Sequence, residues 1–160
     1  MAYYLDERSE NCLVEGNLSV GVVRPSHNHM AKGNTIRNNV FVSDTEARIT
    51  FPRSSDYTFE WNVICDKGQI VLENPDAITT LRNNVLFSAE GKIQCCRLKD
   101  YSFAGSYSFE ADGQNLTADP LITEFEKGRV GFATDSAVLR LGVKPIDVSG
   151  AGPRSCGDGK

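Results

Sequence analysis

Side chains suited to acid–base chemistry and to sugar binding occur in two short segments near the N-terminus. Tyr4, Asp6 and Glu7 lie in the first segment, and Asn28 and His29 lie in the second. Carboxylates and imidazoles move protons near neutral pH, and phenols and amides hydrogen-bond to hydroxyl groups. We therefore predict Asp6 and His29 as candidate catalytic residues. Tyr4, Glu7 and Asn28 are predicted to bind substrate beside them.

A complete two-acid hydrolase site is not visible around Asp6. Glycoside hydrolysis needs two carboxyl groups, about 5 to 5.5 Å apart for retention or about 6.5 to 9.5 Å apart for inversion. Parallel strands stack about 4.8 Å apart. A partner one repeat further along would come from Asn28 or His29, and neither is a carboxylate. The competing interpretation of Asp6 is a solvated acid at a strand end, or a cap of the following turn.

His27 and His29 alternate along the chain, so both imidazoles would point to one side of a strand. This pattern is compatible with metal ligation or acid–base chemistry. The interpretation that we prefer is a core His27 and a strand-end His29 that fixes the next turn. Calcium prefers six or more oxygen ligands, and Asp44 with Glu46 is too small a cluster. The five cysteines show no CxxC spacing and are expected to be free thiols. We predict neither a metal site nor a cofactor.

An asparagine recurs at a nearly constant interval along the chain. Asn17, Asn39, Asn62 and Asn84 are separated by 22, 23 and 22 residues, and a further step of 22 leads to Ser106. The positions three before, one after and three after each of these anchors hold residues that can be buried, which is typical of strands. Short strands recurring at this interval leave no room for a helix in each repeat. The pattern predicts an all-β fold, a right-handed parallel β-helix of about five coils.

Each anchor asparagine is expected at a tight corner between two strands, because asparagine tolerates a left-handed backbone conformation. Stacked amides would then hydrogen-bond from coil to coil as an asparagine ladder. A third strand should precede each anchor, and counting 12 residues back places Leu5 and His27 in it, pointing inward. Tyr4, Asp6 and Asn28 are therefore expected to face solvent.

Composition limits the class of protein and its partners. The chain has 160 residues, 40% hydrophobic and 24% charged, which is typical of one globular domain. We expect coils over 1–112, a final edge and C-terminal cap over 113–148, and a flexible tail over 149–160. A net charge of −4 argues against nucleic acid and anionic membranes as partners. No apolar run approaches the ~20 residues of a membrane span. The N-terminus lacks a secretory signal, so a cytoplasmic location is expected for the chain as written.

Several segments carry a resemblance to a known family. They are Tyr4-Leu-Asp-Glu7, Val14-Glu-Gly-Asn17, His29 followed by Gly33 to Asn39, Asp119-Pro-Leu121 and Asp135 to Asp147. Together they resemble the pectate-lyase-like superfamily of right-handed parallel β-helices, in particular the C-terminal part of bacterial β-helical glycoside hydrolase-like proteins. The resemblance implies a fold that hosts lyases, hydrolases, epimerases and inert proteins. It also implies relatives that are usually secreted or periplasmic.

The expected function is that of a short β-helix protein related to carbohydrate-active enzymes, non-catalytic alone, that binds a poly- or oligosaccharide. One alternative is a glycoside hydrolase or polysaccharide lyase whose site is completed by another subunit or by an N-terminal part. The other alternative is a structural role for the chain as an oligomeric solenoid. Strand edges and apolar side chains at the N-terminal coil favour a homo-oligomer formed through that coil. Trp61 is interpreted either as a sugar-stacking platform or as an aromatic that covers a corner.

Overall fold

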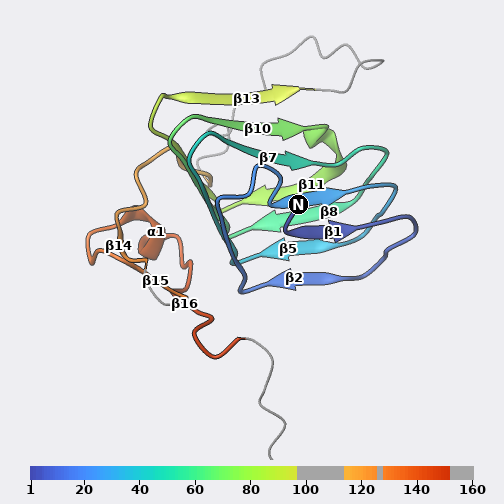
Figure 1. Ribbon diagram of the computed structural model, residues 1–160. Helices are drawn as coiled ribbons and strands as arrows, with labels where there is room; N and C mark the ends of the chain where they lie inside the picture. Colours follow the sequence, from blue (N-terminus) through green and yellow to red (C-terminus); the bar gives the residue numbers. More distant parts are fainter. Residues whose placement is uncertain (97–113, 126–127, 152–160) are drawn as a thin grey trace, which may run out of the picture.

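The computed structural model describes residues 1–96, 114–125 and 128–151. Within these residues the chain winds repeatedly through three parallel sheets (Figure 1). Sheet 1 contains, in order, β1 (Tyr3–Leu5), β4 (Ser26–Asn28), β7 (Glu46–Thr50), β10 (Gln69–Glu73) and β13 (Lys92–Cys96). Sheet 2 contains β2 (Leu13–Glu15), β5 (Thr35–Arg37), β8 (Tyr57–Glu60) and β11 (Ile78–Arg82). Sheet 3 contains β3 (Leu18–Val20), β6 (Val40–Ser43), β9 (Val63–Asp66) and β12 (Val85–Ser88).

The strands form a parallel β-helix of four complete coils, and β13 begins a further one. The apolar positions three residues before the anchors lie in one register on sheet 2. Val14 pairs with Ile36, Ile36 with Phe59, and Phe59 with Leu81. A period of two on each strand directs these side chains to the same face, toward the interior. The predicted all-β parallel β-helix is confirmed.

The asparagine ladder is present and has a fifth rung. In each step the side-chain Nδ2 of one asparagine donates to Oδ1 of the next, over 2.9–3.1 Å, and the backbone N–H of the first donates to the same oxygen. The rungs are Asn17, Asn39, Asn62, Asn84 and Asn115. Asn115 follows Asn84 by 31 residues, so a longer excursion separates the last two rungs. Ser106, predicted as the fifth rung, lies outside the described residues.

The left-handed corner lies one residue before each anchor. Gly16, Asn38, Trp61 and Asn83 have φ values of 68°, 49°, 53° and 57°, whereas the anchors themselves do not have positive φ. The expectation that the anchor asparagine itself adopts this conformation is wrong. The chain turns at the preceding residue, so that both the amide side chain and the backbone N–H of the anchor can face the next rung.

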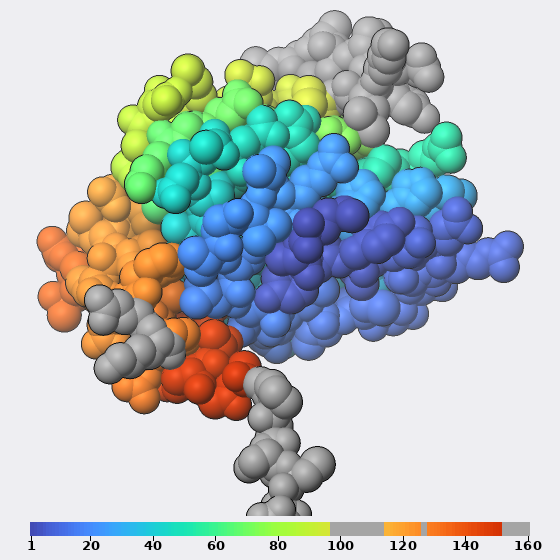
Figure 2. Space-filling model, in the orientation of Figure 1, coloured from blue at the N-terminus to red at the C-terminus, as the bar shows by residue number. Residues whose placement is uncertain are grey.

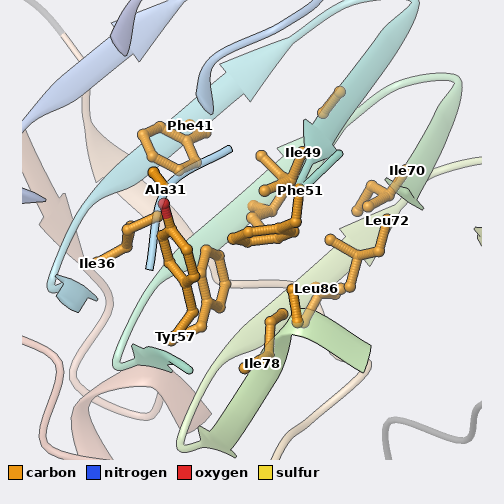
Figure 3. Close-up of a cluster of buried hydrophobic side chains, with 14 residues drawn as sticks. Ala31, Ile36, Phe41, Ile49, Phe51, Tyr57, Ile70, Leu72, Ile78 and Leu86 are labelled. Carbon is orange, nitrogen blue, oxygen red and sulfur yellow. The ribbon is translucent and has the colours of Figure 1, made fainter. Parts of the chain in front are cut away.

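The core fills the space between the three sheets. Aromatic rings concentrate where sheet 1 turns toward sheet 2: Phe51 packs edge-on against Tyr57 and Phe59, with ring centres 5.0 and 6.4 Å apart. Ile49 and Leu72 approach these rings from sheet 1 (Figure 3). Burial of these side chains is the main source of stability for the coils.

A small cap packs on the outside of sheet 3. It comprises the strands β14 (Ile122–Glu124), β15 (Arg129–Phe132) and β16 (Ile146–Asp147), with α1 (Ala137–Arg140) between β15 and β16. Val130 and Val138 of the cap share a buried cluster with Val40 and Val63 of sheet 3. Helix α1 begins with a side-chain cap from Ser136 and ends near the positive-φ residue Gly142, which are common boundaries of a helix. The tail residues 152–160 lie outside the described part of the chain.

Candidate functional site

The outer face of sheet 1 carries a column of side chains from matching positions on five adjacent strands. The strand register aligns Tyr4, His27, Thr50, Glu73 and Cys96. Figure 2 shows the coils as successive bands, from blue at the N-terminal coil to yellow-green at β13. The column therefore crosses the full stack of coils. We call the residues of this column, together with Asp6, His29, Glu46, Arg48 and Gln69 beside it, the sheet 1 face.

Asp6 and His29 meet at one end of this face, as predicted from their interval in the sequence. His29 Nδ1 lies 3.2 Å from Asp6 Oδ1, and the Asp6 side chain is 56% exposed. The pKa of the Asp6 carboxyl is lowered, chiefly by a hydrogen bond from the Tyr4 hydroxyl and then by the backbone N–H of Glu7 and by His29. The same carboxylate raises the pKa of Tyr4. Asp6 is thus an ionised, solvent-accessible acceptor.

Three aromatic rings stack beside this carboxylate. The Tyr4 and His27 rings are 5.1 Å apart at 25°, and the His27 and His29 rings are 6.3 Å apart at 5°. His27 Nδ1 also hydrogen-bonds to Thr50 Oγ1. Partial burial lowers the pKa of His27, and the nearby charge of Arg24 adds to this effect. His27 is therefore held as a neutral ring in a short aromatic stack.

The structure reverses the predicted orientations of His27 and Asn28. His27 faces outward and is half-buried, whereas Asn28 is buried and faces the interior, where its Nδ2 donates to Ser26 Oγ and Thr50 O, both at 3.1 Å. Asn28 lies opposite Leu5 in the β1–β4 pairing. The segment from Asn28 to its anchor Asn39 is therefore one residue shorter than the segment from Leu5 to its anchor Asn17. A one-residue slip moves a strand residue to the opposite face. The expectation that Asn28 faces solvent is wrong, and the buried amide is not available to a substrate.

The far side of the face is organised by Arg48. Its Nε and Nη2 donate to the two oxygens of Glu46 at 2.7 and 3.2 Å, and its Nη1 donates to Glu73 at 3.1 Å. Gln69 donates to the same Glu46 carboxylate. The hydrogen bond from Arg48 lowers the pKa of Glu46, and the Glu46 carboxylate raises the pKa of Arg48. The Glu46 carboxylate is therefore ionised, and Arg48 pairs with both Glu46 and Glu73.

Among the residues that the structure describes, the sheet 1 face does not bring together the two free acids of a glycosidase. Glu73 lies three strands from Tyr4 in the column, which corresponds to about 14 Å at the ordinary strand spacing. This separation exceeds the range of about 5 to 9.5 Å for paired catalytic carboxyls. Glu7 is an exposed turn residue and adds negative charge beside Tyr4. The acid–base groups brought together at the N-terminal end are Asp6, His29 and Tyr4.

The sequence prediction missed Thr50, Glu73 and Arg48 as members of this face. A signal for the first two was present, because Thr50 and Glu73 follow His27 by one and two steps of 23 residues. Arg48 lies two residues before Thr50 on the same strand, and alternation places both side chains on one side. Asp44 and Glu46, predicted to be too small a cluster for calcium, each have a basic partner: Asp44 pairs with Lys67 and Glu46 with Arg48, both at 2.7 Å. Within the described ranges, no group of three or more potential metal ligands occurs.

Trp61 covers a corner, one of its two predicted roles. Its Nε1 donates to Leu141 O in the cap over 3.0 Å, and the Arg82 guanidinium lies 5.5 Å from the ring centre. The indole also lines a pocket of about 230 Å³ with Arg37 and Lys144. Trp61 thus connects the coils to the cap.

The chain was compared with family models, with curated proteins and with solved structures, and none of them matches. In the part of the chain that the structure describes, no helix is long and apolar enough to cross a membrane. The architecture and the geometry of the sheet 1 face are therefore the basis for a functional proposal.

Proposed function

We propose that the sheet 1 face binds an oligosaccharide, and that the chain does so without cleaving it on its own. The observation that carries this proposal is the stack of Tyr4, His27 and His29 with the ionised Asp6 carboxylate at its edge. Aromatic rings pack against the C–H faces of sugars, and Tyr4, at the end of the stack, is 48% exposed. The carboxylate accepts hydrogen bonds from sugar hydroxyl groups.

The arrangement of the face supports a chain-like ligand. The column runs perpendicular to the strands and continues past Thr50 to Glu73. Thr50 and Glu73 are themselves buried, so a ligand beyond the aromatic stack would contact the partly exposed Arg48 and Gln69. Successive sugar units lying along the column would meet a new strand about every 4.8 Å. Arg48 and Gln69 offer hydrogen-bond donors beyond the aromatic stack, next to carboxylates that they already contact.

A relation to the pectate-lyase-like superfamily is part of this proposal. It is supported by the parallel three-sheet coils, by the asparagine ladder and by the segments quoted above. The architecture alone does not determine an activity, because one fold supports many functions. The proposal of a sugar ligand therefore rests on the residues of the sheet 1 face.

A glycan array followed by calorimetric titration of the best ligand tests the proposal. Replacing Asp6 by Ala should weaken binding at least tenfold, because a hydrogen bond to a charged group contributes about 1.5–3 kcal/mol. Asp147→Ala is the matched control, since Asp147 is similarly exposed but pairs with Arg129 in the cap. Equal binding by the wild type and the Asp6 variant would refute the assignment, as would a ligand located on another face.

A second candidate function is depolymerisation by a glycoside hydrolase or polysaccharide lyase reaction. The Asp6–His29 pair favours it, because a carboxylate that orients an imidazole supports proton transfer. The missing acid would come from a neighbouring subunit or from a further part of a longer chain. A reducing-end assay on polysaccharides distinguishes the two functions: activity lost in His29→Gln would establish catalysis, and binding without release of reducing ends would support the non-catalytic role.

We also propose that a chain of these 160 residues self-associates. Among the described strands, β1, β2 and β3 have a sheet neighbour on one side only, and Leu13 and Val20 on this edge are more than half exposed. Strand edges and apolar surface favour association. Light scattering at micromolar concentration should show a dimer or larger species that Leu5→Glu disrupts, and a stable monomer of 17.5 kDa would contradict it.

A further inference from the structure

A second concave feature lies at the corner where sheet 1 turns toward sheet 2. It is a pocket of about 320 Å³, and its lining includes Arg8, Lys32, Arg53 and Ser55. The pocket adjoins the sheet 1 face, because Arg8 follows Asp6 by two residues and Met30, which also lines the pocket, directly follows His29. A ligand lying on the sheet 1 face could therefore reach it.

Three consecutive coils place a side chain at this corner with a left-handed backbone. Arg8, Met30 and Arg53 have φ values of 63°, 52° and 54°. The Arg8 N–H donates to Met30 O, and the Met30 N–H donates to Pro52 O, both at 3.0 Å, so the three turns are stacked. Left-handed residues also turn the chain at other corners of this fold, and here three of them line one pocket.

The charge of the pocket is positive on a protein with a net charge of −4. The lining contains three basic side chains and one acid, Glu10, which pairs with Lys32 at 3.3 Å. Among the described residues, no carboxylate lies within ion-pair distance of Arg8 or Arg53. Arg53 Nη1 contacts the Met30 sulfur at 3.9 Å instead. Two guanidinium groups, one on each side of Met30, are therefore left with unused donors facing a hollow.

We propose that this pocket binds an oxyanion, a sulfate, phosphate or carboxylate group, between Arg8 and Arg53. Guanidinium groups bind such groups through paired N–H donors. Lys32 adds a positive charge to the lining of the pocket. The Ser55 hydroxyl also lines the pocket and donates a hydrogen bond to Asp56 over 2.8 Å. Where the oxyanion is carried by a sugar, this inference rests on the proposed function and specifies an acidic oligosaccharide. Where it is a free ion, the pocket is a separate site.

The test is a titration of the isotope-labelled full chain with inorganic phosphate or sulfate at constant ionic strength, followed by amide chemical shifts. The variants Arg8→Asn and Arg53→Asn remove the charge while keeping a residue that tolerates positive φ, as Asn38 and Asn83 do here. They should therefore fold, and each should weaken oxyanion binding at least fivefold. Arg129→Gln, in the cap, is the control and should bind as the wild type does.

Three ligands distinguish the source of the oxyanion: inorganic phosphate, a sulfated or uronic oligosaccharide, and a neutral oligosaccharide of the same length. An acidic glycan is supported if the acidic oligosaccharide binds tenfold more tightly than either other ligand, and if this preference is lost in both Arg53→Asn and Asp6→Ala. Phosphate binding that is lost in Arg53→Asn but retained in Asp6→Ala, with no glycan bound, would support the pocket and refute the sugar proposal. Absence of shifts at Arg8, Met30 and Arg53 with every ligand, or equal weakening by Arg129→Gln, would overturn the inference.

Discussion

Replacement of Asn62 by Leu removes a central rung of the asparagine ladder. Asn62 is fully buried, and its Oδ1 accepts hydrogen bonds from the backbone N–H and the Nδ2 of Asn39, at 3.1 and 2.9 Å. Its Nδ2 donates to Ile36 O and Asn84 Oδ1, at 2.9 and 3.1 Å. Leucine has a similar size but makes none of these bonds. The Asn39 N–H would be left buried without its acceptor.

The orphaned N–H costs about 1–3 kcal/mol and the loss of the other amide bonds about 1 kcal/mol, so we expect a total loss of about 2–4 kcal/mol. Asn17→Leu is the matched control. Asn17 is half-buried at the end of the ladder, and no described residue donates to its side-chain oxygen, so the expected loss is about 1 kcal/mol. Urea unfolding followed by circular dichroism measures both values. Equal losses in the two variants, or an unchanged midpoint for Asn62→Leu, would refute the reasoning.

Three further predictions concern buried charges and thiols. Arg48→Met should lower the free energy of unfolding by about 3–5 kcal/mol, because it leaves the nearly buried Glu73 carboxylate unpaired. In urea unfolding, the double variant Arg48→Met, Glu73→Gln should regain at least half of that loss. Losses that simply add in the double variant would contradict this reasoning. Burial raises the pKa of Cys65 to about 11 and of Cys95 to about 12, so mass spectrometry should find both unalkylated by iodoacetamide at pH 8 until the protein unfolds. Burial also raises the pKa of Asp66, so its contribution to stability falls as pH rises from the unfolded toward the folded pKa. Asp66→Asn should therefore increase the melting temperature at pH 7, and a series of melts at decreasing pH should show this gain shrinking as the pH passes below the folded pKa.

The coils were predictable because each repeat carries its own complete pattern. An asparagine at nearly fixed intervals, with apolar residues at alternate positions around it, requires strands stacked in register. The fifth rung was not predictable from the interval, because 31 residues separate Asn84 from Asn115. The spacing rule therefore led to Ser106 instead.

The site was predictable only in part, because side-chain direction depends on turn length. Asp6 and His29 meet because their interval of 23 residues matches one coil of sheet 1. His27 and Asn28 exchange faces because the turn after β4 is one residue shorter than the turn after β1, a difference that the anchor spacing hides. Alternation along β7 places Arg48 on the outer face with Thr50, but its ion pair with Glu73 on the neighbouring strand depends on the coil register.

The most direct measurement is an amide chemical-shift titration of the labelled chain with the best glycan from the array. Binding at the sheet 1 face predicts shifts at Tyr4, Asp6, His27 and His29 that saturate together and disappear in Asp6→Ala. Shifts confined to sheet 2, sheet 3 or the cap, or no shift with any glycan, would contradict oligosaccharide binding at this face.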